Sequence, residues 1–334
     1  MVKSMGASLY VPANHKYLMD VADGERMGHV RSLIFCTEDS VADADLSWAL
    51  FNLSVVLANM KVESSADRFV RVRNPEVMAR VLAMPGVEKL TGFVIPKATR
   101  YNFESYFKQV RTTEHMLMPT LETAEVFNDW EMRQFRKLLE APGVRTRILA
   151  LRIGGNDLLA LLGLRRPRTM TIYRTPLGPV LARLVTTFRP YGFVLTAPVF
   201  EHLDLPELLD QEVTEDMAYG MVGKTAIHPS QITLIEQHYR VKPNDLAAAR
   251  AILDVNSPAV FKMHDSMCEV ATHRAWAERM IEQSNVFGSY LDGAHHDGAH
   301  HDGARIDSAH GEGPHIESAR HDAPPLNSAM PREL

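Results

Sequence analysis

Residues 148–163 read ILALRIGGNDLLALLG, and this stretch carries the pattern that decides the fold. Ile148–Ile153 is a short, apolar, partly β-branched run, which predicts a buried strand. Gly154 and Gly155 allow a tight turn, and the apolar run after Asp157 predicts a helix. The stretch is therefore a strand, a turn and a helix, which is the unit from which parallel sheets are built.

The same unit recurs along the first 240 residues. Eight strand-like runs alternate with longer stretches of helical periodicity, which predicts an α/β fold with a parallel sheet. Eight units fit a closed (β/α)8 TIM barrel better than an open doubly wound sheet. No G-x-G-x-x-G follows the first run and no G-x-x-x-x-G-K-[ST] occurs, which disfavours a nucleotide-binding fold. The predicted strands are Ser8–Pro12, Ser32–Cys36, Phe69–Val72, Gly92–Ile95, Met116–Pro119, Ile148–Ile153, Gly192–Thr196 and Thr225–His228.

The rest of the 334-residue chain divides by composition into an extension and a tail. After the barrel at 1–240, we predict a helical extension over 241–291, packed on the barrel or on a neighbouring subunit, with helices at Asn244–Leu253 and Met263–Gln283. From 292 to 334 a five-residue repeat combines an acid, a small residue, Ala or Pro, and often His or Arg. This repeat has almost no large apolar residues, so we predict a disordered tail. Its seven histidines among acids leave a weak metal-binding role open.

The composition disfavours several classes of protein. Hydrophobic residues make up 46 % of the chain, enough for a sizeable core, while two cysteines cannot form a disulfide framework. There is no apolar run typical of a signal peptide or a membrane span, so we expect a cytoplasmic protein without a membrane partner. The tail carries the whole formal net charge of −5 and leaves the body balanced. This balance argues against nucleic acid as a partner.

Two acidic residues follow neighbouring strands of the predicted barrel, at the end where barrels of this kind place their active sites. Glu122 follows the fifth strand and Asp157 the sixth, close enough for both carboxylates to share a cation such as Mg²⁺. Gly154 and Gly155 let the backbone approach a ligand beside Asp157. Acids after strands also cap helices, so helix capping is the alternative for Asp157.

Other charged residues lie at or near the predicted strand ends. Glu38 and Asp39 directly follow the second strand, and Arg71 lies within an otherwise apolar strand. A buried guanidinium needs a carboxylate or a substrate anion as partner, so Arg71 binds either a substrate or an internal acid. Lys97 follows the fourth strand and is a candidate Schiff-base lysine, although a salt bridge is the favoured interpretation. For His228 we favour a structural role.

The chain carries eight short motifs at these positions, between Tyr10 and Glu269, within a resemblance that covers roughly residues 8–281. Each motif is weak alone, but their order along the chain is specific. They are Tyr10–Asn14 (YVPAN), Phe35–Val41 (FCTEDSV), Val70–Arg73 (VRVR), Val94–Lys97 (VIPK), Pro119–Thr123 (PTLET), Gly154–Leu158 (GGNDL), Gly223–Gln231 (GKTAIHPSQ) and Asp265–Glu269 (DSMCE).

In these motifs the sequence resembles the HpcH/HpaI aldolase and citrate lyase β-subunit superfamily. Within it, the sequence is most similar to the stand-alone C–C bond lyase branch of TIM-barrel proteins linked to tellurium-stress gene clusters. The resemblance implies a Mg²⁺-dependent lyase that cleaves or forms a carbon–carbon bond through an enolate. The implied substrate is a small keto or hydroxy acid or its acyl-CoA thioester. The implied metal ligands are Glu122 and Asp157, and the implied substrate-binding arginine is Arg71. We also predict that Arg73, Gly155 and Asn156 bind substrate.

The resemblance also implies an oligomer and leaves the proton-transfer group open. In relatives the last acid of the final motif can reach a neighbouring subunit's active site, and here that residue is Glu269. The candidates for general acid or base are therefore Glu269, Glu38 and Asp39, and we expect a homo-oligomer, a trimer or a hexamer.

Two departures from the family pattern keep other functions open. Cys36 stands where the family has Asp, and Arg73 stands where it usually has Asn. One alternative is a ligand-binding or stress-response scaffold on a barrel that has lost its chemistry. The other is a metal-free aldolase that forms a Schiff base on Lys97.

Overall fold

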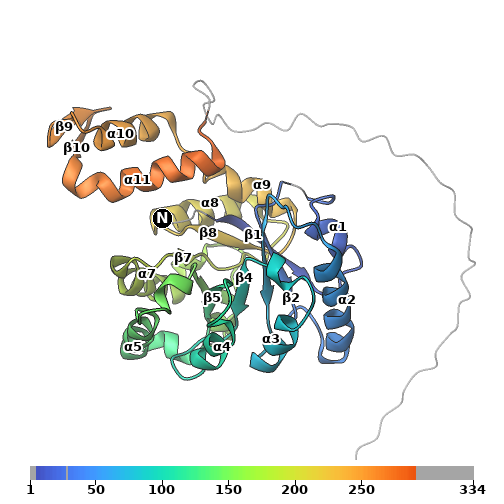
Figure 1. The fold of residues 1–334 in the computed structure, drawn as a ribbon. Helices are drawn as coiled ribbons and strands as arrows, with labels where there is room; N and C mark the ends of the chain where they lie inside the picture. The colour runs from blue at the N-terminus through green and yellow to red at the C-terminus, as the bar shows by residue number, and fades with distance from the viewer. Residues whose placement is uncertain (1–4, 28, 291–334) are drawn as a thin grey trace, which may run out of the picture. The chain divides into compact units, whose positions relative to one another are not determined.

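The strands form a single parallel sheet. They are β1 (Gly6–Pro12), β2 (Ser32–Cys36), β3 (Asp67–Arg71), β4 (Gly92–Ile95), β5 (Met116–Leu121), β6 (Leu151–Ile153), β7 (Leu195–Thr196) and β8 (Gly223–Ala226). Their order is β7-β6-β5-β4-β3-β2-β1-β8, and the two edge strands meet through the parallel bridge between Ala197 and Lys224. The sheet therefore closes on itself, and the predicted (β/α)8 barrel is confirmed (Figure 1).

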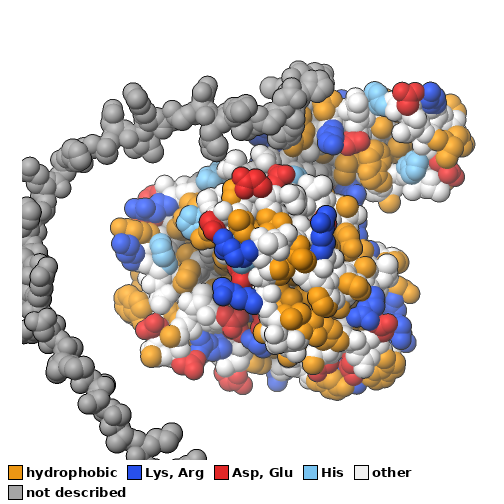
Figure 2. Space-filling model, turned by 180° about the vertical axis from the view of Figure 1, so that it is seen from behind, with side chains coloured by type: hydrophobic (Ala, Val, Ile, Leu, Met, Phe, Trp, Pro, Cys, Tyr) orange, Lys and Arg blue, Asp and Glu red, His pale blue; other side chains and the backbone are white. Residues whose placement is uncertain are grey.

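The computed structural model describes residues 5–27 and 29–290. The predicted repeat tail at 292–334, with its metal-binding alternative, lies outside these residues. The barrel and the extension belong to one compact unit, Met1–Asp292. Within the described ranges, none of the helices is both long enough and apolar enough to cross a membrane. Figure 2 shows acidic and basic side chains interspersed over the face that it displays.

Helices follow every strand and surround the sheet (Figure 1). Local sequence fixes where some of them begin: the Asn74 side chain accepts a hydrogen bond from the backbone N–H of Val77 at 2.8 Å, and Pro75 is the first helical residue. The helices of the barrel are α1 (Leu18–Ala22), α2 (Leu46–Asn59), α3 (Pro75–Leu82), α4 (Phe103–Val110), α5 (Asp129–Leu139), α6 (Gly155–Leu161), α7 (Leu177–Phe188), α8 (Pro206–Ala218) and α9 (Ser230–Gln237).

Strand residues alternate between two apolar clusters. Ile34, Phe69 and Val94, from β2, β3 and β4, belong to a small cluster that fills the inside of the barrel. Their neighbours along the strands, such as Phe35 and Val70, belong to the large cluster that packs the sheet against the helices. This alternation is the expected consequence of side chains pointing to opposite faces of a strand, and it decides which residues face the barrel lumen.

The extension differs from its prediction in one respect. α10 (Pro243–Leu253) is present, but the predicted helix at Met263–Gln283 is wrong at its start, because α11 begins at Val270 and runs to Phe287. Residues 260–269 instead form an antiparallel hairpin of β9 (Val260–Met263) and β10 (Ser266–Glu269). Its turn residues, His264 and Asp265, both have positive φ angles, 47° and 61°. Such a turn normally carries Asn or Gly, so the sequence held no clear hairpin signal.

Candidate active site

A cavity of about 320 Å³ opens at the C-terminal ends of the strands. At this end of the barrel the side chains that face the lumen change from apolar to polar. In β3, Arg71 lies two residues beyond Phe69, and in β5, Thr120 lies two residues beyond Met118. The cavity therefore lies directly above the apolar filling of the barrel. The predicted site residues that line it are Asp39, Arg71, Glu122, Gly155, Asn156 and Asp157.

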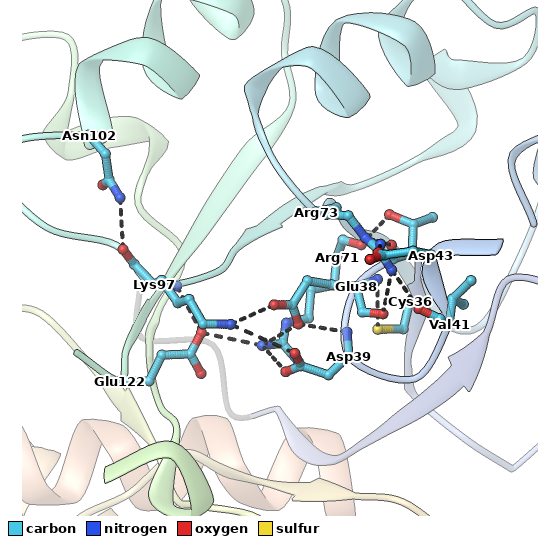
Figure 3. A network of polar contacts seen from close by, with 11 residues as sticks. Cys36, Glu38, Asp39, Val41, Asp43, Arg71, Arg73, Lys97, Asn102 and Glu122 are labelled. Atoms are coloured by element: carbon cyan, nitrogen blue, oxygen red, sulfur yellow. Dashed lines mark hydrogen bonds and ion pairs between the residues drawn. The ribbon is translucent and has the colours of Figure 1, made fainter. Parts of the chain in front are cut away.

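The buried guanidinium of Arg71 joins three carboxylates at one wall of the cavity (Figure 3). Its Nη2 lies 2.8 Å from Glu38 Oε2, 3.1 Å from Asp39 Oδ2 and 3.3 Å from Glu122 Oε1. Burial alone lowers the pKa of Arg71, but the surrounding acidic groups outweigh burial and raise it, so the charge is retained. Its Nε is buried and makes no hydrogen bond within the described part of the chain. Arg71 thus has its predicted internal partners, and its Nε is left without one.

Glu38 and Asp39 titrate as a pair. Burial raises the pKa of Glu38, and its neighbour Asp39 raises it further. For Asp39 burial also acts to raise the pKa, but the hydrogen bond with Glu38 and the charge of Arg71 outweigh burial and lower it. The more exposed Asp39 lines the cavity, whereas Glu38 is buried behind it. Of the two, Glu38 is therefore the carboxyl that binds a proton more readily.

Lys97 forms the salt bridge that the sequence favoured over a Schiff base. Its Nζ lies 2.7 Å from Glu38 Oε1 and 3.7 Å from Asp39 Oδ1. Burial lowers the pKa of Lys97, but these two carboxylates outweigh burial and raise it, which keeps the amine protonated and non-nucleophilic. Lys97 also has a φ of 48°, and its backbone N–H donates to Glu122 Oε1 at 2.8 Å. Its strained backbone therefore helps to orient Glu122.

Glu122 and Asp157 are the two predicted metal ligands, and the pKa values of both are raised. Burial raises the pKa of Glu122 and, despite Arg71, the charge of Asp157 raises it further. Burial also raises the pKa of Asp157, and Asp39 adds to this. Burial and neighbouring carboxylates therefore disfavour the charged form of both acids, and a divalent cation in the cavity would offset this. In the described residues no group of three or more His, Cys, Asp or Glu has metal-binding geometry. Mg²⁺ typically takes one or two protein carboxylates and keeps water and substrate oxygens as its other ligands.

The turn at Gly154 and Gly155 brings β6 close to Glu122. A Cβ atom on Gly154 would lie 2.2 Å from Glu122 Oε2, so only glycine fits at this position. Gly154 is also the N-cap of α6 and makes no side-chain cap, and Asp157 lies inside the first turn. Asp157 is therefore not the cap that the alternative interpretation required. The Asn156 side chain donates to Glu201 Oε2 at 3.0 Å.

Three of the predicted site residues lie outside the cavity lining. Arg73 donates to the backbone carbonyls of Thr37, Glu38 and Val41 and pairs with Asp43, so its guanidinium braces the loop after β2 (Figure 3). Glu38 lies behind Asp39, as described above. Glu269 is the last residue of β10, and its backbone N–H donates to His273 Nδ1. A role for Glu269 in a neighbouring subunit stays a prediction.

Two cavity residues were missed from the sequence. Arg152, the middle residue of β6, is 1 % exposed and lines the cavity, as does Tyr10 of β1. The guanidinium carbons of Arg152 and Arg71 lie 5.3 Å and 5.8 Å from the centre of the Tyr10 ring. A signal for Arg152 was present: it is the one charged residue in the run ILALRI, just as Arg71 interrupts its own strand.

Residues 1–289 match the family described as C–C bond lyase of the TIM-barrel fold. The chain belongs to this family. The match confirms the resemblance to the citrate lyase β superfamily, and at the level of the family it confirms the prediction of an enzyme of the carbon–carbon lyase class.

Relatives of this C–C bond lyase family member agree with the assignment. The citrate lyase subunit beta-like protein of Deinococcus radiodurans is 26 % identical over 178 residues, 53 % of this chain and 58 % of that protein, so the match spans a little over half of the relative. The CitE protein of Mycobacterium tuberculosis, solved with magnesium, acetoacetate and coenzyme A, has a TM-score of 0.63 and 20 % identity over 85 % of this chain and 100 % of its own.

A malate synthase of Haloferax volcanii, solved as a pyruvate/acetyl-CoA ternary complex, has a TM-score of 0.58 and 16 % identity. This likeness covers 69 % of this chain and 68 % of that one. At such identities the two solved structures show a shared fold.

Proposed function

We propose that this family member is a Mg²⁺-dependent lyase that cleaves or forms a carbon–carbon bond in a small keto or hydroxy acid, or in its acyl-CoA thioester, through an enolate. The observation that carries this proposal is that two acids, Glu122 and Asp157, line one cavity with the Arg71 guanidinium, and that the charge of Asp157 raises the pKa of Glu122. The magnesium and acetoacetate in the Mycobacterium tuberculosis protein support the same metal and ligand class.

The residues around the cavity have separate tasks in this reaction. Glu122 and Asp157 would hold Mg²⁺, which when bound stabilises, as a Lewis acid, the negative charge that develops on the enolate oxygen. Arg71 offers its unpaired Nε to a substrate oxygen, and the carboxylates around its Nη2 hold the guanidinium in place. The salt bridge of Lys97 to Glu38 and its backbone bond to Glu122 keep this wall rigid.

Proton transfer falls to the Glu38–Asp39 pair in this proposal. Asp39 faces the cavity and accepts the proton, and the neighbouring Glu38, whose pKa is raised by burial, shares it. Glu269 of a neighbouring subunit is the other candidate, and it requires the predicted homo-oligomer. A variant that lacks the Asp39 carboxylate separates the two, because it keeps Glu269.

Cys36 and Arg73 depart from the family pattern and motivated the alternative of a non-catalytic scaffold, but they leave this geometry intact. Cys36 lines the cavity, and its Sγ accepts a hydrogen bond from the backbone N–H of Glu38 at 3.5 Å. Arg73 holds the loop that carries Glu38 and Asp39. Both substituted residues therefore support the position of the proposed acid–base pair.

The metal requirement is tested by removing the metal. We expect a chelator to abolish carbon–carbon cleavage of a panel of keto acids and acyl-CoA thioesters, and added Mg²⁺ to restore it, because the enolate charge is stabilised only with the cation present. Borohydride should trap no substrate on Lys97, whose amine stays protonated. Activity that survives the chelator, together with an adduct on Lys97 detected by mass spectrometry, would instead establish the Schiff-base aldolase.

The role of Glu122 as a metal ligand is tested by substituting Gly154, the glycine that lies against its side chain. In Gly154→Ala the new methyl group would push Glu122 Oε2 away, and we expect the Mg²⁺ affinity measured by calorimetry to fall roughly tenfold to a hundredfold. Gly163→Ala is the control, because Gly163 also loses glycine's freedom, at a φ of 68°, but has no atom within 4 Å of the new Cβ. Unchanged affinity in the Gly154 variant would show that Glu122 does not bind the metal.

A further inference from the structure

Arg152 belongs to a buried polar level inside the barrel, one step below the proposed metal ligands. In the sheet, Arg152 pairs in register with Thr120 of β5 on one side and with Thr196 of β7 on the other. Residues in register point to the same face of a sheet, and Arg152 and Thr120 line the cavity, so all three side chains face the lumen. Ser8 and Thr225 are also in register with each other, and Thr225 lines the same cavity.

Several hydrogen-bonding groups at this polar level have no partner among the described residues. Arg152 Nη2 donates to Thr225 Oγ1 at 2.6 Å, but Arg152 Nη1 has no partner within the described ranges. The hydroxyls of Ser8, Thr120 and Thr196 are buried and lack partners as well. A buried polar group without a partner is unfavourable, and an unpartnered cation is more so. The arrangement is that of a site which a ligand completes.

The contrast with Arg71 shows what kind of ligand is missing. Arg71 is surrounded by three carboxylates, whereas no carboxylate among the described residues forms an ion pair with Arg152. A guanidinium with hydroxyl groups beside it matches a carboxylate, which accepts two parallel hydrogen bonds from the planar fork. The positive charge of Arg152 therefore favours binding of an anion, which can reach Arg152 through the cavity.

The depth of Arg152 sets the length of that ligand. Thr120 is opposite Arg152, and Glu122 lies two residues further along β5, so the backbone of Arg152 is about 7 Å deeper in the barrel than that of Glu122. A ligand held at Glu122 and Asp157 by one end would reach Arg152 with a group a few bonds away. This spacing suits a short acid with a carboxylate at each end.

We propose that Arg152 binds the second carboxylate of the substrate, so that the site selects short dicarboxylic keto or hydroxy acids over their monocarboxylic analogues. This inference rests on the proposed function, since the metal holds the other end. Arg152 is then a specificity-determining residue, and Thr225 positions it through the hydrogen bond to Nη2.

The test compares two ligands that differ by one carboxylate. Malate is lactate with a carboxylate added to its methyl carbon, and calorimetry gives Kd for both on the full chain with Mg²⁺. We expect the wild type to bind malate roughly tenfold to a hundredfold more tightly than lactate, the range expected of hydrogen bonds to a charged group. Arg152→Gln should lose this preference and leave the Kd for lactate unchanged. If Arg152→Gln does not fold, as judged by circular dichroism, Thr225→Val serves instead and should reduce the preference.

Each other outcome overturns the inference. Equal affinity of the wild type for the two acids, or no binding of malate at millimolar concentration, removes the second-carboxylate site. A variant that weakens malate and lactate by the same factor shows that Arg152 is a structural cation satisfied by buried water. The proposed function fails separately: a malate preference that persists in chelator contradicts the metal while it upholds Arg152.

Discussion

Replacing Asp157 by alanine is expected to abolish both Mg²⁺ binding and lyase turnover while the barrel stays folded. Asp157 is half-buried, lines the cavity with Glu122 and raises the pKa of that carboxyl group. The variant would keep a single carboxylate, too few to hold Mg²⁺ against water. Since a bound metal contributes several kcal/mol to stabilising the developing charge, the rate should fall by about a thousandfold or more. Calorimetry for the metal and a coupled assay for turnover measure the two effects.

A matched control separates loss of the metal from loss of helix stability. Asp245 lies in the first turn of α10, as Asp157 lies in the first turn of α6, and Asp245 is remote from the cavity lining. Asp245→Ala should bind Mg²⁺ and turn over like the wild type. Full turnover by the Asp157 variant in the presence of chelator would contradict the metal-dependent mechanism.

The barrel was predictable because its signals are local. In ILALRIGGNDLLALLG the strand, the turn and the helix follow one another within 16 residues, and the unit repeats eight times. The acids at strand ends were predictable for a related reason, since the topology brings neighbouring strand ends together. The hairpin at 260–269 was not, because His264 and Asp265 adopt positive φ angles without the glycine or asparagine that announces such a turn.

The parts of the site that were missed depend on register and on side-chain direction. Arg152 enters the cavity because it is paired with Thr120, and a pairing between strands 30 residues apart in sequence cannot be derived from either strand alone. Arg73 looks like a site arginine in sequence, but its long side chain turns back to three backbone carbonyls of the preceding loop. Where a flexible cation points is decided by acceptors elsewhere in the fold.

Replacing Arg71 by methionine is expected to destabilise the fold and to remove activity. Arg71 Nη2 is the shared partner of Glu38, Asp39 and Glu122, and its side chain is 11 % exposed. Removing one partner of a buried ionic group leaves the other charges uncompensated, which costs about 3 kcal/mol or more. Urea denaturation in the presence of chelator measures the loss of unfolding free energy without a contribution from bound metal.

The loss should depend on pH in one direction. In the wild type, burial already raises the pKa values of Glu38 and Glu122 above 4.5, while Arg71 opposes the rise. Without Arg71 both values rise further, so the folded variant binds protons more tightly than the unfolded chain, and its stability is recovered as the pH falls through these raised values. The deficit relative to wild type should therefore be large near pH 8 and smaller near pH 5.

The control for Arg71 is an arginine whose ion pair is exposed. Arg165 lies 3.3 Å from Glu201, and its side chain is 88 % exposed. Arg165→Met should change the unfolding free energy by less than about 0.5 kcal/mol at either pH, because solvent screens such pairs. A deficit in Arg71→Met that is equal at both pH values, or larger in acid, would show that the carboxylates around Arg71 are not what it stabilises.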